Sequence, residues 1–123
     1  MVSIKNNSNN RTSDNAKNPN VNKMNNDSDI ISDQVYKNLS ITDVSVVIDK
    51  QNKSTYTATI TNLEDTNSIE TINVVFKDKD GNIIDTLTGF IGLDLKKGEQ
   101  TIISSFTDLD LSNATSIEYK EGN

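Results

Sequence analysis

The sequence contains no cysteine, no histidine and no tryptophan, and it has a single proline. Without His and Cys, the chain cannot form a Ser-His-Asp triad, a Cys-His dyad, a Cys/His zinc site or a histidine general base. No disulfide framework can hold the fold either. We therefore predict a non-enzymatic protein that has no catalytic residues and no cofactor.

Basic residues are also scarce. The chain has 12 Lys and Arg residues and 18 Asp and Glu residues, which gives a formal net charge of −6. An acidic surface repels phosphate backbones, and no Lys/Arg cluster with interleaved aromatics offers a local exception, so we expect no nucleic-acid partner. No segment approaches the roughly 20 apolar residues of a membrane helix, and no signal peptide is visible. Contact with a membrane is expected only through an anchor outside this sequence.

The composition changes near residue 30. The first stretch, "MVSIKNNSNNRTSDNAKNPNVNKMNNDSDIISD", is rich in Asn, Ser and Asp, and its apolar residues stand singly until Ile30 and Ile31. Such a segment buries too little apolar surface to offset the entropy of ordering it. We predict a disordered tether over residues 1–34 and a folded domain over residues 35–123. Composition leaves open whether the tether is a spacer or merely a chain end.

The clearest strand pattern is "STYTATITN". Tyr56, Ala58 and Ile60 share one face, and threonines fill the other, which is typical of a half-buried strand. In the preceding run, "LSITDVSVVID", the apolar positions change parity across Thr42 and Asp43, which predicts either a β-bulge or a change of sheet there.

Further short strands follow in "IETINVVF", "IIDTLTGFIGLDL", "EQTIISSF" and "TSIEYK". Turn signals recur roughly every 8–12 residues, and no segment keeps a helical period. We predict an all-β fold, an antiparallel immunoglobulin-like β-sandwich of about seven strands. Its expected core contains the aliphatic residues of the strands and five aromatics. Residues assigned to the core include Ile72, Val74, Ile102, Ile117, Phe76, Phe90, Phe106, Tyr56 and Tyr119.

The turn in "VVFKDKDGNII" has a predicted register. A two-residue loop would set Phe76 opposite Asp85 and place a carboxylate in the core. A three-residue loop sets Phe76 opposite Ile84 instead, with Gly81 in the left-handed position. We predict the second register, with Asp78 accepting backbone N–H bonds at the start of the turn.

Residues 40–120 resemble a known family. An alternating strand that ends at Asn62, an acidic loop, a strand that ends at Asp78, a turn with Gly81 and the "KKGE" turn before the strand ending at Phe106 form the pattern. This order resembles the FxLYD-type immunoglobulin-like domain of Gram-positive bacterial surface proteins and lipoproteins. The name-giving motif is partly kept, because Val74, Phe76 and Lys77 stand at its Phe, Leu and Tyr. The resemblance implies an immunoglobulin-like sandwich in the cell envelope, held by a lipid or membrane anchor, with no catalytic residues to transfer.

Two acidic runs raise the question of calcium. The candidate ligands are Asp78, Asp80, Asp108 and Asp110. A helix-loop-helix calcium loop needs oxygen ligands at positions 1, 3, 5 and 12 and Gly at position 6. With Gly81 at position 6, Phe76 falls at position 1 and Leu87 at position 12, and neither ligates. The second run, "DLDLSN", has Asn113 in place of the Gly and Tyr119 in place of the Glu. We predict no metal site, and a second loop that Leu109 and Leu111 pin to the core.

The remaining candidates are surfaces. Paired carboxylates for glycoside hydrolysis need a cleft that a small sandwich lacks, so the acidic residues are interpreted as solvated faces. The threonine stripe could contact a partner, although Thr is ordinary on a strand. The apolar run "GFIGLDL" is either irregular and buried, or it exposes one or two side chains as a contact; we predict the first.

The sequence therefore predicts a monomeric, non-enzymatic, extracellular module of a bacterial cell-envelope protein, tethered to the membrane in the full-length protein. Its expected role is structural, or contact with an unknown protein partner at the cell surface. The alternative is a small-ligand or carbohydrate-binding β-sandwich module, possibly calcium-assisted.

Overall fold

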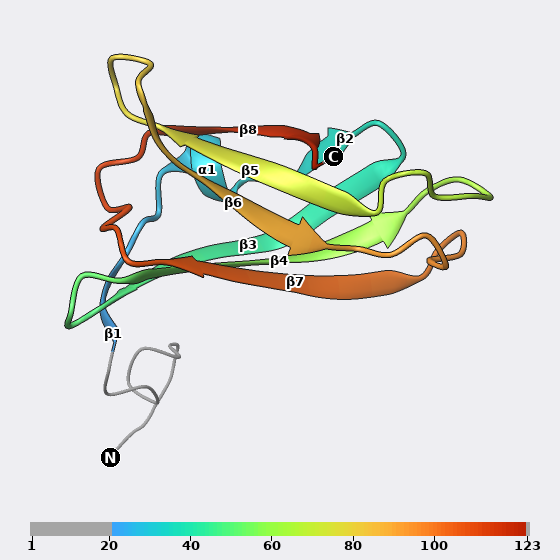
Figure 1. Ribbon diagram of the computed structural model, residues 1–123, viewed down its shortest axis with the longest axis horizontal. Coiled ribbons are helices and arrows are strands. Elements are labelled where there is room, and N and C mark those ends of the chain that lie inside the picture. Colours follow the sequence, from blue (N-terminus) through green and yellow to red (C-terminus); the bar gives the residue numbers. More distant parts are fainter. Residues whose placement is uncertain (1–20, 123) are drawn as a thin grey trace.

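The computed structural model describes residues 21–122, which fold into two antiparallel β-sheets packed face to face (Figure 1). The five-stranded sheet contains β1 (Val21–Met24), β2 (Gln34–Tyr36), β3 (Leu39–Asp49), β4 (Ser54–Asn62) and β7 (Gln100–Thr107). The three-stranded sheet contains β5 (Thr71–Lys77), β6 (Ile83–Phe90) and β8 (Ser116–Glu121). The helix α1 (Ser28–Ile31) has one turn, and no helix in the described residues is long and apolar enough to cross a membrane. The predicted antiparallel sandwich is confirmed, with eight strands in place of about seven.

The order of the strands follows the immunoglobulin-like plan. β3 and β4 form one hairpin, β5 and β6 form another, and the connections β4–β5, β6–β7 and β7–β8 each cross between the sheets. The larger sheet thus has the neighbours β3–β4–β7, and the smaller has β6–β5–β8. These are the places of strands A, B and E in one immunoglobulin sheet and of C′, C and F in the other.

The alternating strands lie as predicted. Tyr56, Ala58 and Ile60 of β4 are buried between the sheets, and the threonines between them face outward. The register between β3 and β4 shifts after Thr42, and Asp43 has a positive φ of 54°. The predicted bulge is therefore confirmed, and it keeps the apolar residues on both sides of it directed into the core.

Three of the five aromatic residues predicted for the core, Tyr56, Phe76 and Tyr119, are buried between the sheets. The rings of Tyr56 and Phe76 pack edge to face, with centroids 5.8 Å apart and planes at 80°. The hydroxyl of Tyr56, on the larger sheet, lies 2.8 Å from that of Tyr119, on the smaller sheet. Burial raises the pKa of both phenols, so the pair stays protonated and joins the two sheets by a neutral hydrogen bond.

This hydroxyl pair makes a testable contribution to stability. Replacing either Tyr56 or Tyr119 with phenylalanine is expected to lower the free energy of unfolding by about 1–2 kcal/mol, because the remaining buried hydroxyl loses its partner. The double variant should lose less than the sum of the two single losses. Urea denaturation of the four proteins measures this coupling, and strictly additive losses would show that the hydroxyls act independently.

Three residues assigned to the core are exposed instead. Phe90, Phe106 and Ile102 face solvent, and Ile103 is buried in place of Ile102. The register of β7 explains why Ile102 and Phe106 are exposed. Ile103 lies opposite the inward-facing Ala58, so the alternate residues of β7, which include Ile102 and Phe106, face outward. Phe90 lies opposite Thr71, on the outer face of the smaller sheet.

The predicted boundary of the tether at residue 34 is wrong. Ile30 of α1 is fully buried in the core, where the helix packs beside β3 and β8. The amide of Asn25 donates to the carbonyls of Leu111 and Ala114, both at 2.9 Å. Residues 21–34 thus belong to the fold. They contain no long apolar run, but one buried isoleucine and hydrogen bonds to the rest of the domain are enough to hold them in place. The rest of the predicted tether, residues 1–20, lies outside the described residues.

The predicted register of the β5–β6 hairpin is also wrong, although its turn is right. Gly81 has a φ of 82°, and the backbone N–H of Asp78 donates to the carbonyl of Asn82 at 2.9 Å, which closes the three-residue loop. A bulge then follows, so Phe76 lies opposite Asp85 rather than Ile84. The carboxylate is tolerated there because Asp85 is only half-buried at the sheet edge, where the hydroxyl of Thr107 donates to it at 2.6 Å.

The same edge brings β6 and β7 together from opposite sheets. A Cβ atom at Gly89 of β6 would lie 2.9 Å from the Cβ of Ile103 on β7, closer than side chains tolerate. The hydroxyl of Ser105 also donates to the carbonyl of Thr88. β6 therefore covers the inward side of β7 and leaves its outward side uncovered among the described residues.

Candidate interaction surface

The outer face of the larger sheet is the strongest candidate site, and we call it the threonine face. It is formed by the outward residues of β3, β4 and β7: Ser40, Thr42, Ser45, Val47, Thr55, Thr57, Thr59, Thr61, Gln100, Ile102, Ser104 and Phe106. None of these residues is charged, although 24% of the whole chain is. Asp43, in the bulge, and Asp49, at the end of β3, lie at its border.

Strand pairing sets these side chains in rows across the face. Phe106 pairs with Thr55, which pairs in turn with Val47. Ile102 pairs with Thr59, and Ser104 lies between the two apolar residues on β7. The face therefore presents three apolar side chains, of which Ile102 and Phe106 are exposed, beside hydroxyls that donate and accept hydrogen bonds. Depletion of charge in the centre of a patch is typical of protein interfaces.

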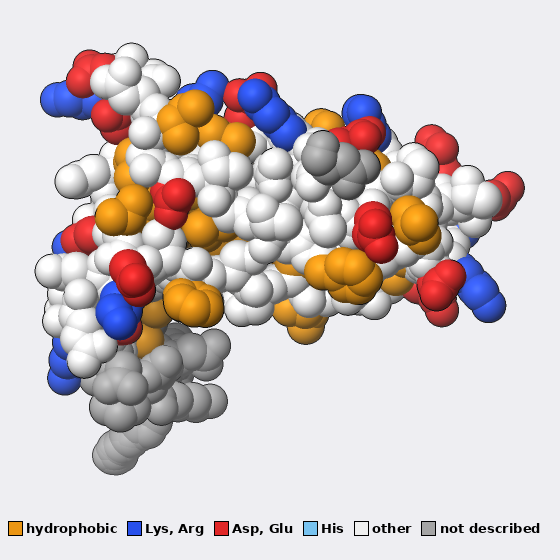
Figure 2. Space-filling view, viewed as in Figure 1, with side chains coloured by type: hydrophobic (Ala, Val, Ile, Leu, Met, Phe, Trp, Pro, Cys, Tyr) orange, Lys and Arg blue, Asp and Glu red, His pale blue; other side chains and the backbone are white. Residues whose placement is uncertain are grey.

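The apolar side chains of β7 are unusually open. Phe106 is 75% exposed and Ile102 is 72% exposed, more than any other large hydrophobic side chain among the described residues. Figure 2 shows hydrophobic side chains along the lower margin of the molecule, where Figure 1 places β7. Phe is one of the residue types enriched in protein interfaces, and exposed apolar patches rimmed by polar residues mark interaction sites.

A second apolar surface lies at the "GFIGLDL" run, where the prediction of an irregular and buried segment is half right. Residues 91–99 lie between strands, and Ile91 is buried. Phe90 and Leu93, however, are exposed. They line an open groove of about 770 Å³ whose rim carries the carboxylates of Glu70, Asp94 and Glu99.

The first pair of calcium candidates belongs to the hairpin turn. The carboxylate of Asp78 accepts the backbone N–H of Asp80 at 2.9 Å and that of Asn82 at 3.0 Å, as predicted for a residue that starts a turn. Asp80 is exposed at the tip of the same turn. One of the two oxygens of Asp78 is therefore already engaged by the backbone.

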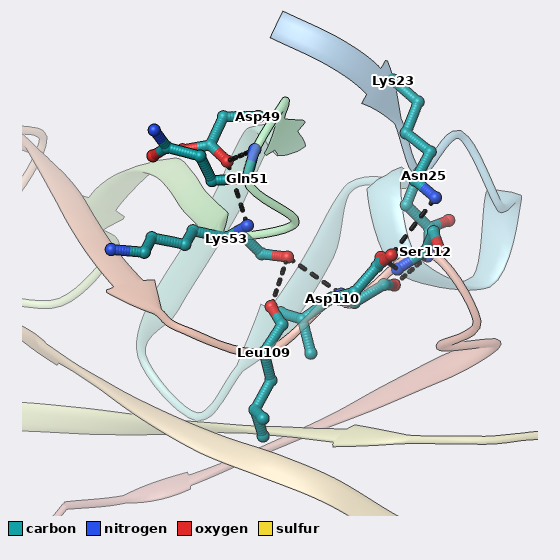
Figure 3. Close-up of polar contacts among 10 residues, drawn as sticks. Lys23, Asn25, Asp49, Gln51, Lys53, Leu109, Asp110 and Ser112 are labelled. Carbon is teal, nitrogen blue, oxygen red and sulfur yellow. Dashed lines mark hydrogen bonds and ion pairs between the residues drawn. The ribbon is translucent and has the colours of Figure 1, made fainter. Parts of the chain in front are cut away.

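The second pair lies in the loop before β8. The carboxylate of Asp110 accepts the backbone N–H of Ser112 at 2.8 Å and pairs with the ammonium of Lys23 at 3.2 Å (Figure 3). The bonds from Ser112 and the charge of Lys23 lower the pKa of Asp110. Asp108 is exposed, with the ammonium of Lys53 at 3.8 Å.

The leucines of this loop divide between core and solvent. Leu111 is fully buried, as predicted, but Leu109 is about half exposed. The hydroxyl of Ser54 donates to the carbonyl of Leu109 at 2.8 Å and accepts the N–H of Leu111 at 2.9 Å, so the backbone of the loop is held by β4. Across residues 21–122, the acidic side chains form no group of three or more that could hold a metal ion.

Comparisons with protein-family models, with curated proteins and with solved structures found no match for this chain. Gly81, in the turn between β5 and β6, has a positive φ of 82°, a backbone conformation that favours glycine. Gly98 of the "KKGE" turn also has a φ of 82°.

Proposed function

We propose that the protein is a non-enzymatic interaction module of a bacterial cell-envelope protein, and that it contacts a protein partner through the threonine face. The observation that carries the proposal is the pairing of two open apolar side chains, Ile102 and Phe106, with an uncharged hydroxyl surface. In a chain with a net charge of −6, such a face offers a place where a partner of either charge binds without burying a carboxylate.

The envelope location is supported by the resemblance to FxLYD-type domains and by the Asn-rich composition of the first residues. In this proposal the module is extracellular and is held at the membrane by an anchor outside the sequence. The rigid two-sheet domain would then hold the threonine face in a fixed orientation for a partner on the same cell or beyond it.

The proposal predicts a contact that depends on Phe106. A photo-crosslinking amino acid at the exposed Thr55, beside Phe106, should form a discrete adduct in intact envelope preparations, whereas the same probe at Thr86, on the outer face of β6, should not. Phe106→Ser should weaken the adduct about tenfold or more, since an aromatic anchor contributes at least 1–2 kcal/mol.

Ile83→Ser is the matched control, because Ile83 is 62% exposed and lies on β6 of the smaller sheet, away from the threonine face. Both serine variants should keep the melting temperature of the parent, which shows that the fold is intact. Equal adducts from Thr55 and Thr86, or an adduct unaffected by Phe106→Ser, would argue against the threonine face as the site.

The alternative is a carbohydrate or small-ligand module, and the groove beside Phe90 is the observation that favours it. An aromatic wall with carboxylates at the rim suits a sugar ring. A ligand at about 100 times its Kd stabilises the folded state by about 2.7 kcal/mol, so binding must raise the melting temperature.

Under the primary proposal, millimolar calcium and cell-wall glycans, added separately and together, are expected to leave the melting temperature unchanged. Asp78 and Asp110 already have protein partners, so calcium would have to displace them. A rise with glycan that Phe90→Ala abolishes would favour the groove and the alternative function. A rise with calcium alone that Asp78→Asn abolishes would favour a metal site at the turn.

A further inference from the structure

β7 is an edge strand without the features that normally protect a sheet edge. It forms the end of the larger sheet, and within residues 21–122 it pairs only with β4. Its eight residues, "QTIISSFT", include no charge and no proline. Edge strands are usually blunted by charged side chains, by proline or by shortness. β8, an edge of the other sheet, carries Glu118 and Lys120, and β1 and β2 have only four and three residues.

The backbone groups that face away from β4 can be identified. The N–H of Asn62 donates to the carbonyl of Glu99 at 3.1 Å, so this pair is a hydrogen-bonded one in the antiparallel ladder. Because bonding alternates along such a ladder, the N–H and C=O of Gln100, Ile102, Ser104 and Phe106 point toward the free edge. These residues are also the ones whose side chains form the β7 part of the threonine face.

We propose that this edge pairs with β7 of a second copy of the chain, antiparallel and centred on Ser104. In this register Ser104 lies opposite Ser104 of the second copy, and Ile102 lies opposite its Phe106. The two most exposed apolar side chains thus become cross-strand partners on one face, while the free backbone groups meet each other. The arrangement is isologous, since each copy supplies the same strand.

Charge favours the same register. Glu99 would lie opposite Leu109 of the second copy, and Asp108 would lie opposite its Gln100, so no two carboxylates face each other directly. The side chains that β6 already covers, Ile103 and Ser105, remain on the inward side. The pairing goes beyond the proposed function because it uses the backbone edge of β7, and it replaces the expectation of a monomer. The small contact and the net negative charge of both copies predict a weak, concentration-dependent dimer.

A disulfide test exploits the absence of cysteine. Paired residues in a hydrogen-bonded antiparallel site have Cα atoms about 5.5 Å apart, which suits a disulfide. Ser104→Cys in the full chain should therefore form a covalent dimer under mild oxidation, as seen on a non-reducing gel. Thr55→Cys, exposed on the same face but one strand inward, should remain monomeric. Crosslinking of Thr55→Cys alone, or of neither variant, overturns the proposal.

Sedimentation equilibrium gives the second measurement. The weight-average mass of the unmodified chain should rise above 13.6 kDa toward twice that value as concentration approaches the millimolar range. Ser104→Pro should hold it at the monomer value, because the N–H that proline removes does not bond β4. If Ser104→Pro fails to fold, Ile102→Lys replaces it as the test variant, and it should also stay at the monomer mass because a charge on the edge strand opposes pairing. A constant 13.6 kDa for the parent overturns the pairing. Ser104→Pro removes the dimer contact but keeps Phe106. If this variant is monomeric and still forms the Thr55 adduct, the partner contact of the proposed function does not depend on the dimer, and the two proposals can fail separately.

Discussion

Replacing Ile30 with alanine is expected to lower the free energy of unfolding by about 2–4 kcal/mol, the usual cost of deleting a buried branched side chain. Ile30 is fully buried although it lies on a helix of only one turn, and it fills the edge of the sandwich between β3 and β8. Nothing else on α1 reaches the core so completely, so the cavity would stay partly unfilled. Urea denaturation of the parent and the variant measures the loss.

A pair of truncations tests the same segment more broadly. A chain that begins at residue 21 and one that begins at residue 35 differ in residues 21–34, which contain β1, α1 and the first residue of β2. The shorter chain also loses the bonds from Asn25 to Leu111 and Ala114, so we expect it to be far less stable or unfolded. The control for Ile30→Ala is Val35→Ala, at an exposed position, which should lower the free energy of unfolding by less than about 0.5 kcal/mol. Equal stability of the two truncations would contradict the role assigned to this segment.

The second large effect is expected at Asn62, which is fully buried at the end of β4. Its side-chain oxygen accepts the amide of Asn38 at 2.8 Å and the backbone N–H of Glu64 at 3.1 Å. Its amide donates to the carbonyl of Leu95 at 2.8 Å. Asn62→Ala removes all three bonds and leaves buried groups unpaired, so we expect a loss of about 3 kcal/mol or more.

The control for this substitution is Asn73→Ala. Asn73 also accepts a side-chain hydrogen bond, from the hydroxyl of Thr88 at 2.8 Å, but it lies on the outer face of the smaller sheet, where water can replace its partner. We expect a loss below about 0.5 kcal/mol. Similar losses for Asn62→Ala and Asn73→Ala, compared by denaturant midpoint, would show that the buried amide network contributes little.

The sequence was sufficient to predict which side chains face the core wherever every second residue of a strand is apolar and the residues between are polar. Tyr56, Ala58 and Ile60 alternate with threonine, so their direction into the core follows from period alone. The turn at Gly81 was predictable for a similar reason, because Asp78 and Gly81 suit only a few turn geometries.

The sequence was insufficient to predict side-chain direction or register where neighbouring residues of a strand are both apolar or where a bulge adds a residue. In β7, Ile102 and Ile103 are adjacent, and only pairing with β4 decides that Ile103 faces inward. That decision also exposes Phe106, and with it the candidate interaction surface. The bulge after Phe76 similarly reverses the register that the turn alone would set. Ile30 gave no periodic signal because a single buried side chain has no period.

The placement of β1 has a mechanical consequence. Val21 pairs with Asp49 at one end of the sandwich, whereas Gly122 bonds Thr71 at the other end (Figure 1). A pull applied at these two points would run along the strands, so the hydrogen bonds between β1 and β3 would be sheared together rather than unzipped one at a time. A domain loaded in this direction resists stretching better than one whose edge strand is peeled away.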